Sequence, residues 1–155
     1  MLPPWRPVHD VEGHAPASVR TVDCVFCAIV AGEAPSRPVA SGEHWTAFLD
    51  ISPVTTGHTL VVPRRHAEDI WAMSAEQAQQ LMGGVHEVAQ LLRERLAPAG
   101  MNLLQSNGVA AWQTVFHVHV HVIPRYEGDG LRPPSPLGPA APEDLTAVHE
   151  RITGG

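Results

Sequence analysis

One short stretch of the chain alternates between histidine and valine. It reads HVHVH over residues 117–121 and has apolar residues on both sides. Successive side chains of a β-strand point to opposite faces of a sheet, whereas one face of a helix repeats every three to four residues. The alternation therefore predicts a strand over Val115–Ile123 with three imidazoles on one face and valines on the other.

The two faces of this predicted strand require different surroundings. The valine face is suited to a hydrophobic core, whereas the imidazole face must meet solvent, a metal ion or a ligand. Surface histidines on an edge strand, or simple metal capture, would also produce such a face. Histidine is a poor filler for a strand, so three in strict alternation favour a functional site over these two alternatives.

Further strands and helices are predicted along the chain. Apolar residues recur at helical spacing from Ser74 to about Ala97, and Pro98 ends this long helix. A shorter helix is expected over residues 24–31, with Asp23 as its N-cap. Helices and strands are mixed without regular alternation, which favours an α+β fold with an antiparallel sheet. The remaining strands are expected at Pro38–Ser41, Trp45–Asp50, Thr59–Pro63 and Met101–Gln105.

The chain is expected to form one domain over residues 23–155, preceded by an extended or poorly ordered arm over residues 1–22. Its 155 residues fall in the size range of a single domain. The arm contains four prolines and shows no apolar periodicity. Residues 129–142 contain five prolines, which predicts a loop before a last short helix over residues 143–152.

Charge and hydropathy narrow the possible partners. The formal net charge of −6 argues against a nucleic acid polymer, which would call for a basic face. A small anionic ligand remains compatible, because histidines and backbone N–H groups bind phosphate without a net positive charge. No apolar run is long enough to span a membrane, and the N-terminus lacks the pattern of a secretory signal, so we expect a cytoplasmic protein.

The two cysteines of the chain lie three residues apart, on one turn of the first predicted helix. Cys24 and Cys27 could bind a metal ion, carry out redox chemistry, or form an empty dithiol. A redox pair of this spacing usually belongs to a thioredoxin-like βαβ unit, and no such unit is predicted here. Metal binding is therefore the favoured interpretation.

The histidine stretch and its surroundings resemble the histidine triad (HIT) superfamily, and specifically its small Hint-like and bacterial members. The family signature His-φ-His-φ-His-φ-φ, in which φ is apolar, is met by residues 117–123. The resemblance covers about Asp23 to Gly130 and implies a five-stranded antiparallel sheet with one long helix and one or more short ones. Supporting segments, in family order, are residues 24–29, 48–53, 57–63 with His66, 113–116, 124–126 and 128–130.

The resemblance implies catalysis at a phosphorus atom. The middle histidine of the family attacks the α-phosphorus of a nucleotide, and water or another acceptor then resolves the nucleotidyl-histidine; that position is His119. His121 matches a residue that donates to phosphate oxygens, and His58 matches one beside the nucleophile. Gln113 and Thr114 match residues near the phosphate and the leaving group. Neutral imidazole is a nucleophile at physiological pH, so these assignments are chemically reasonable.

The resemblance also implies a nucleotide-binding site. Asp50 matches the carboxylate that accepts the ribose hydroxyls, although a turn residue at a strand end would look the same. Two positions depart from the family: Ser106 replaces a common asparagine, and Trp112 replaces a common glycine whose backbone N–H binds phosphate. The residues that match the apolar slot around the base, each of which could instead be ordinary core, are Val25, Phe26, Ile29, Phe48 and Ile51.

Zinc-containing bacterial relatives suggest what the cysteines bind. His66 and His117 match the positions that complete a Cys2His2 site with Cys24 and Cys27. Zinc prefers four nitrogen or sulfur ligands in a tetrahedron. The expected cofactor is therefore a structural zinc ion, which gives His117 a structural role rather than a catalytic one.

The expected function is hydrolysis or transfer at the α-phosphorus of purine nucleoside phosphoramidates or related nucleotide conjugates. Two alternatives remain: hydrolysis of dinucleoside polyphosphates, and nucleotide binding with little turnover, for which Trp112 is the motivating residue. The family is usually a homodimer whose two sheets join edge to edge. The long helix from Ser74 is a candidate dimer element, although a core helix would show the same apolar stripe.

Overall fold

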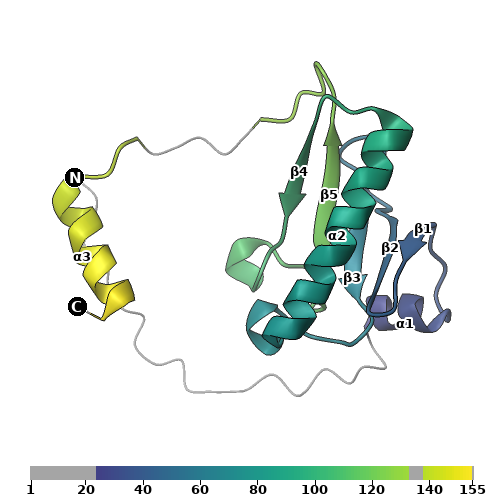
Figure 1. Cartoon of the computed structure of the whole chain (residues 1–155), viewed down its shortest axis with the longest axis horizontal. Coiled ribbons are helices and arrows are strands. Elements are labelled where there is room, and N and C mark those ends of the chain that lie inside the picture. Colours follow the sequence, from purple (N-terminus) through teal and green to yellow (C-terminus); the bar gives the residue numbers. More distant parts are fainter. Residues whose placement is uncertain (1–23, 133–137, 155) are drawn as a thin grey trace.

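The computed structural model describes residues 24–132 and 138–154. This part of the chain contains a five-stranded sheet and helices of very different lengths (Figure 1). Helices α1 (Val25–Ala31) and α2 (Ala75–Leu96) accompany the sheet, and α3 (Pro142–Thr153) follows it. The strands are β1 (Pro38–Ser41), β2 (Trp45–Leu49), β3 (Thr59–Pro63), β4 (Gly100–Leu104) and β5 (Val120–Arg125), and the short 3-10 helices are η2 (Ile70–Ala72) and η3 (Val109–Ala111).

All paired strands of the sheet are antiparallel, in the order β1-β2-β3-β5-β4. β5 therefore lies between β3 and β4, and β4 forms one edge of the sheet. This architecture confirms the predicted α+β fold with a five-stranded antiparallel sheet, one long helix and short helices.

Helix α2 covers one face of the sheet and forms the main core with it. A capping box begins the helix: the Ser74 hydroxyl accepts from Gln77 N–H, and the Gln77 side chain accepts from Ser74 N–H. Gly84 allows a close approach to β2, because a Cβ atom there would lie 2.4 Å from the Trp45 ring. The buried residues of this core include Val61, Val85, Val88, Val118, Val120 and Val122.

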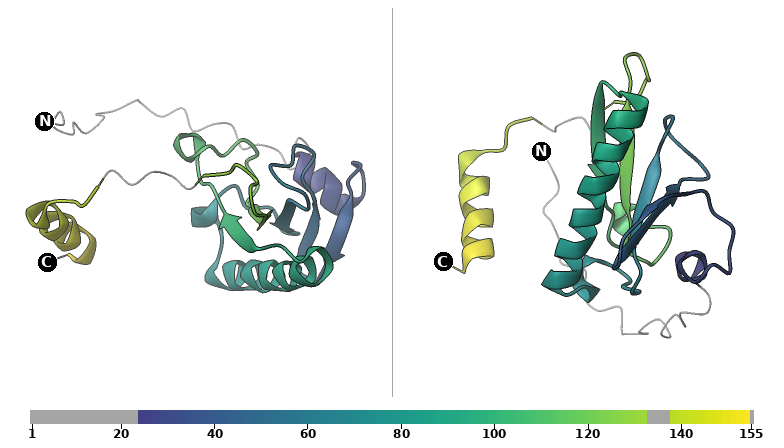
Figure 2. Two further views of the ribbon diagram at one scale, coloured as in Figure 1. Left: turned by 90° about the horizontal axis from the view of Figure 1, so that it is seen from above. Right: turned by 45° about the vertical axis from the view of Figure 1, so that its right-hand side comes forward.

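Helix α1 lies on the opposite face of the sheet (Figure 2). Phe26 of α1 packs edge to face on Phe48 of β2, with 5.5 Å between ring centroids. Leu60 and Val62 of β3 belong to the same small core, as does Cys24. The two faces of the sheet therefore have separate cores, and the histidines lie at the smaller one.

The predicted strand over Val115–Ile123 is wrong in its extent, although its two faces are as predicted. β5 begins only at Val120 and runs on to Arg125. The preceding residues pair with loop groups rather than with a strand; Val118 N–H donates to the Ala67 carbonyl oxygen at 2.8 Å, beyond the end of β3. Valine side chains still point into the α2 core, and the imidazoles point to the α1 side.

Other boundaries differ by one or two residues. β2 ends at Leu49, β4 runs over Gly100–Leu104, and α3 runs over Pro142–Thr153. The N-cap of α1 is Cys24, and the predicted cap Asp23 lies outside the described residues. The predicted arm over residues 1–22 also lies outside them, so the proposed domain boundaries stay a prediction.

Helix α3 stands apart from the sheet (Figure 1), and every one of its residues is exposed. No helix in the described ranges is long and apolar enough to cross a membrane.

Candidate active site and metal centre

The side chain of His119 is held in one tautomer by its own backbone neighbourhood. Its Nδ1 lies 2.7 Å from the carbonyl oxygen of His117. A carbonyl oxygen only accepts hydrogen bonds, so Nδ1 carries the proton and Nε2 carries a free lone pair. The ring is 6% exposed and packs edge to face on Phe26, with 5.2 Å between centroids. Nε2 is thus the ring atom of His119 that has a lone pair available for a ligand.

A second chain of hydrogen bonds fixes the tautomers of His58 and His121. Val54 N–H donates to His58 Nδ1 at 3.2 Å, so His58 carries its proton on Nε2. His58 Nε2–H then donates to His121 Nδ1 at 2.9 Å. His121 consequently carries its own proton on Nε2, the atom available to donate to a ligand oxygen.

Burial lowers the pKa of both of these imidazoles. Burial lowers the pKa of His58, and the nearby Asp50 carboxylate opposes that effect only in part. Burial, together with the neighbouring His119 and His58, lowers the pKa of His121 to about 4. A neutral pair is also what the hydrogen-bond chain requires, because His121 Nδ1 must accept.

Asp50 lies beside this pair, and one of its carboxylate oxygens already accepts a hydrogen bond. Its Oδ1 accepts from Ser52 N–H at 2.8 Å, and its Oδ2 lies 3.6 Å from His58 Nε2 and 3.8 Å from His121 Nδ1. These three side chains are close enough to share a cation. The tautomer argues against one, since His58 Nε2 carries a proton as long as Val54 donates to Nδ1. Oδ2 is therefore the oxygen that can accept from a ligand hydroxyl.

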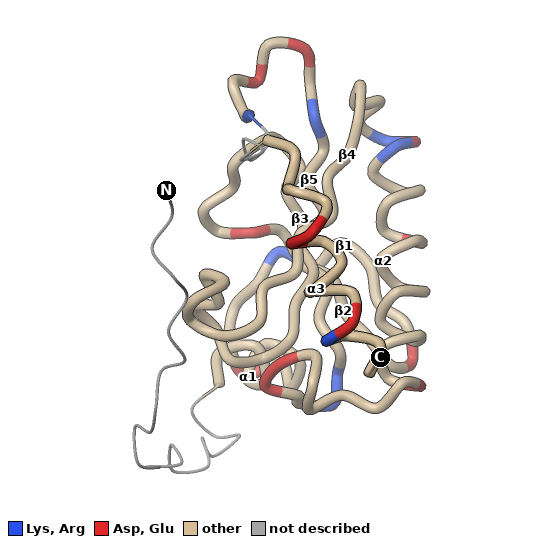
Figure 3. Tube along the Cα trace, turned by 90° about the vertical axis from the view of Figure 1, so that its left-hand side faces the viewer, with Lys and Arg blue, Asp and Glu red and all other residues tan. Residues whose placement is uncertain are grey.

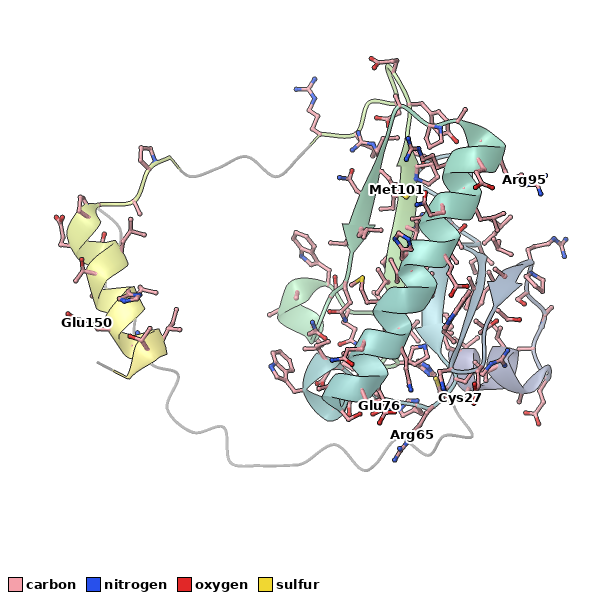
Figure 4. All side chains as sticks on the ribbon, in the orientation of Figure 1. Cys27, Arg65, Glu76, Arg95, Met101 and Glu150 are labelled. Atoms are coloured by element: carbon pink, nitrogen blue, oxygen red, sulfur yellow. The ribbon has the colours of Figure 1, made fainter. Side chains whose placement is uncertain are left out.

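A second group of side chains comes together near α1: Cys24, Cys27, His66 and His117 (Cys27 is labelled in Figure 4). Cys27 Sγ lies 3.3 Å from His66 Nδ1 and 3.5 Å from His117 Nδ1. Cys24 Sγ also lies 3.5 Å from His117 Nδ1, and the two Nδ1 atoms are 3.3 Å apart. Tetrahedral zinc, with bonds of about 2.05 Å to nitrogen and 2.3 Å to sulfur, would separate two nitrogen ligands by about 3.3 Å and a nitrogen and a sulfur ligand by about 3.6 Å.

The surroundings of this cluster also suit a cation. His117 Nε2–H donates to the Pro63 carbonyl oxygen at 2.9 Å, which leaves Nδ1 unprotonated toward the cysteines. Burial and the neighbouring Cys24 raise the pKa of Cys27 to about 11, so a thiolate there needs a positive counter-charge. The donor atoms, their spacing and the tautomer of His117 therefore all fit a Cys2His2 metal site.

Comparison with known proteins agrees with this geometry. A HIT domain model matches residues 31–128, which is more than half of the chain. The chain belongs to the HIT family. Protein hit of Bacillus subtilis is 49% identical over 110 residues, which are 70% of this chain and 76% of that protein. Adenosine 5′-monophosphoramidase hnt1 of Schizosaccharomyces pombe is 38% identical over 133 residues, which are 85% of this chain and 97% of that protein.

Two solved structures of HIT proteins add detail. The crystal structure of SMU.412c from Streptococcus mutans has a TM-score of 0.83 at 34% identity and covers 99% of this chain and 98% of its own. At that coverage the match extends into α3. A zinc-bound histidine triad family protein from Mycobacterium smegmatis has a TM-score of 0.69 at 36% identity, covering 87% of this chain and 99% of its own. Family membership supports nucleotide hydrolase or transferase chemistry in general terms.

In this HIT protein, Gln113 is used to hold the loop before the triad. Its Oε1 accepts from Gly108 N–H at 2.7 Å, and its Nε2 donates to the carbonyl oxygens of Glu68 at 2.6 Å and Val115 at 3.2 Å. Both amide hydrogens are therefore committed to backbone. Gln113 is a positioning residue in this arrangement, whereas the neighbouring Thr114 is exposed.

Trp112 adopts the left-handed conformation that the family's glycine would favour. Its φ is 69° and its ψ is 24°, and its side chain is 81% exposed. Glycine, and to a lesser degree asparagine, adopts this region readily, so a tryptophan here strains the backbone. Trp112 N–H donates to the Val109 carbonyl oxygen at 3.0 Å. The Trp112 N–H, at the position where the family's glycine binds phosphate, is therefore engaged in a hydrogen bond within the chain.

The residues predicted to surround the base divide into two groups. Phe26 and Phe48 are buried in the small core, and Ile29 packs against it. Val25 and Ile51 are exposed, so their side chains remain available to a ligand. Ser106 is half-buried, and its carbonyl oxygen accepts from Gln105 Nε2 at 3.0 Å.

Several partners that define the site are backbone groups, which the sequence cannot single out. Pro63 O, His117 O and Val54 N–H fix three imidazole tautomers, yet any residue type could supply the carbonyl oxygens and any residue but proline the N–H.

Proposed function

We propose that this protein hydrolyses or transfers at the α-phosphorus of purine nucleoside phosphoramidates or related nucleotide conjugates. The single observation that carries the proposal is the hydrogen bond from His119 Nδ1–H to His117 O, because it presents Nε2 as a nucleophile. His121 is the neighbouring ring, with 5.0 Å between centroids, and offers Nε2–H to the phosphate. Nucleophile and donor are thus on one side of the site.

The reaction proceeds through two displacements at phosphorus. The lone pair of His119 Nε2 forms a bond to the α-phosphorus, and the amine leaves with the electrons of the P–N bond and takes up a proton. Water then attacks the same phosphorus, the bond to Nε2 breaks, and the water gives up a proton. His119 returns to its starting tautomer because Nδ1–H stays bonded to His117 O throughout.

Two further groups support a nucleotide ligand. Asp50 Oδ2 is free to accept from ribose hydroxyls, since Oδ1 alone is bonded to Ser52. A small anion is a better match than a polymer, because basic residues are scattered rather than gathered on the face seen in Figure 3. The name of the yeast relative, an adenosine 5′-monophosphoramidase, supports the substrate class.

An assay with adenosine 5′-phosphoramidate tests the proposal, with His119→Ala as the inactive control. Two other outcomes would change the assignment. Turnover of dinucleoside polyphosphates in place of phosphoramidates would assign the alternative substrate to the same histidine. Nucleotide binding by calorimetry without turnover of either would indicate a binding module, an alternative that the engaged N–H of Trp112 favours.

We further propose that Cys24, Cys27, His66 and His117 bind one structural zinc ion. The ion would join α1, the segment after β3 and the triad segment at the base of the active site. It would supply structural stability and hold His117, whose carbonyl orients His119. Metal binding by the two cysteines, in place of a disulfide between them, also favours a cytoplasmic location for the protein.

We propose that the protein is a homodimer joined along β4. This strand forms an edge of the sheet, and its Leu103 and Leu104 side chains are 50% and 46% exposed. Met82 of α2 is 54% exposed nearby, on a groove that also contains Leu103. An open strand edge with apolar side chains favours pairing with a second chain.

A further inference from the structure

We propose that Thr55 is a positioning residue for the reaction, which sets the direction of the hydrogen bond between His58 and His121. The proposal rests on the proposed function, because it takes His121 Nε2–H as the donor to phosphate. The observation that carries it is the hydrogen bond from the Thr55 hydroxyl to the Pro124 carbonyl oxygen, at 2.7 Å. That bond joins the loop after β2 to β5, the strand that contains His121.

Val54 N–H is the group that decides the direction of the bond between the two imidazoles. It donates to His58 Nδ1 at 3.2 Å, so the proton of His58 lies on Nε2 and is donated to His121 Nδ1 at 2.9 Å. If His58 carried its proton on Nδ1 instead, its Nε2 would accept from His121 Nδ1. His121 Nε2 would then have no proton for a phosphate oxygen. The donor at phosphate therefore depends on the position of one backbone N–H.

The Val54 amide belongs to an exposed part of the loop, where packing does not fix it. Residues 51–54 are all exposed, whereas Thr55 is half-buried. Thr55 shares a peptide bond with Val54, and its carbonyl oxygen accepts from His58 N–H at 3.2 Å. Anchoring Thr55 therefore places the Val54 N–H relative to the His58 ring.

The Pro124 carbonyl oxygen is available to Thr55 because β3 is too short to reach it. β3 begins at Thr59, which pairs with Val122 of β5. The same register would place Gly57 opposite Pro124, but Gly57 lies before the strand. The N–H and C=O of one residue in an antiparallel strand face the same neighbour, so the N–H that proline lacks would also have faced this loop. The Thr55 hydroxyl thus takes the place of the missing strand partner.

Two further contacts hold the loop against β5 and α2. The Tyr126 hydroxyl donates to the Thr56 carbonyl oxygen at 3.1 Å. Gly57 has a φ of 85°, and a Cβ atom there would clash with Leu96 of α2, so glycine is required at this close approach. The loop is therefore fixed to the strand that contains His121, and the donor and the acceptor ends of the hydrogen-bond chain have one support.

Long-range nitrogen–proton correlation spectra of the isotope-labelled, full-length protein test the proposal, because they distinguish the two neutral tautomers of each histidine. The wild type should show the protons of both His58 and His121 on Nε2. Thr55→Val should populate the reversed bond and place part of these protons on Nδ1. Thr55→Ser keeps the hydroxyl and should retain the wild-type tautomers. Unchanged tautomers in Thr55→Val would overturn the proposal, as would a wild-type proton on His58 Nδ1.

Thr146→Val is the matched control, because the Thr146 hydroxyl also donates to a proline carbonyl oxygen, that of Pro142 in α3, at 3.0 Å. It should leave both tautomers unchanged, and a shift equal to that of Thr55→Val would overturn the proposal. Should Thr55→Val fail to fold, Tyr126→Phe decides the question. It removes the second, exposed anchor of the loop and should move the tautomers in the same direction; unchanged tautomers would then overturn the proposal.

Turnover of adenosine 5′-phosphoramidate gives a second, independent measurement. Thr55→Val should lower kcat about tenfold, which corresponds to about 1.4 kcal/mol, because fewer molecules would have the His121 Nε2–H donor. Thr55→Ser should stay close to the wild type, and an equal loss in both variants would contradict a role for the hydroxyl. The spectra need no substrate. A wild type without turnover would therefore refute the proposed function and leave the tautomer test intact.

Discussion

His119 donates its Nδ1–H to the carbonyl oxygen of His117, its second neighbour along the chain, at 2.7 Å. One residue thus orients the proposed nucleophile with its backbone and faces the cysteines with its side chain. The proposed zinc site and the proposed catalytic site meet at His117. Loss of the proposed zinc site should therefore also disturb the orientation of His119.

Loss of a cysteine should weaken both the fold and catalysis. Cys24→Ser should abolish zinc binding and lower the free energy of unfolding by several kcal/mol, because the metal joins three segments of the chain. Elemental analysis should give about one zinc per wild-type chain, and thermal unfolding reports the stability. His86, an exposed histidine of α2, provides the control, since His86→Ala should change neither quantity. A wild-type protein that purifies without metal and ignores added zinc would contradict the assignment.

The His58–His121 pair predicts a pH dependence of stability. The folded pKa of His121 is about 4, below the value of about 6.5 expected in the unfolded chain. The unfolded chain therefore binds more protons between these values, so stability is complete above pH 6.5 and falls as the pH is lowered toward 4. Urea unfolding over this range should show a smaller loss in His121→Asn than in the wild type. Parallel curves for the two proteins would count against the buried neutral imidazole.

Replacing Trp112 by glycine should not reduce the free energy of unfolding, unlike most substitutions by glycine. Its left-handed backbone costs about 1 kcal/mol or more in any L-residue other than glycine or asparagine. Trp112→Gly should therefore leave stability unchanged or raise it by up to about 1 kcal/mol. Trp71 is a matched control, because it is 76% exposed and is not among the positive-φ residues of the described chain. Trp71→Gly should destabilise; a similar loss from Trp112→Gly would show that the indole makes a contact that outweighs the strain.

If two chains pair along the open β4 edge, one charged side chain on that edge should weaken the dimer. Leu103→Glu should shift the protein toward monomer in sedimentation experiments, because it places a carboxylate on the β4 surface. Val54→Glu changes a residue of equal exposure, 50%, in the loop after β2 and should leave the mass unchanged. A wild-type monomer at all concentrations would refute the dimer outright.

Periodicity alone predicted which way the triad residues face, since Val118 and Val120 are in the α2 core and His119 meets Phe26. It did not predict where the strand begins. That depends on β3, which ends at Pro63 and leaves the residues before Val120 without a strand to pair with. The local alternation of residues therefore determines which face a side chain points to, whereas the extent of β5 depends on β3, a strand distant in the sequence.

The metal cluster shows the same division. The spacing of Cys24 and Cys27 alone predicted a metal site. His66 and His117 lie 39 and 90 residues from Cys27, so only the resemblance to the family predicted that they belong to it. The hydrogen bonds that set the histidine tautomers were beyond prediction, since they come from backbone groups such as Val54 N–H. The bond from Trp112 N–H to the Val109 carbonyl oxygen likewise joins two backbone groups.

The central claim is that His119 Nε2 forms a covalent bond to the α-phosphorus. Rapid acid-free quenching of the reaction with adenosine 5′-phosphoramidate, followed by peptide mass spectrometry, tests it most directly. The prediction is one adenylyl group on the peptide that contains His119, located on that residue by fragmentation and absent from His119→Ala. An adenylyl group on His58 or His121, or turnover that persists in His119→Ala, would contradict it.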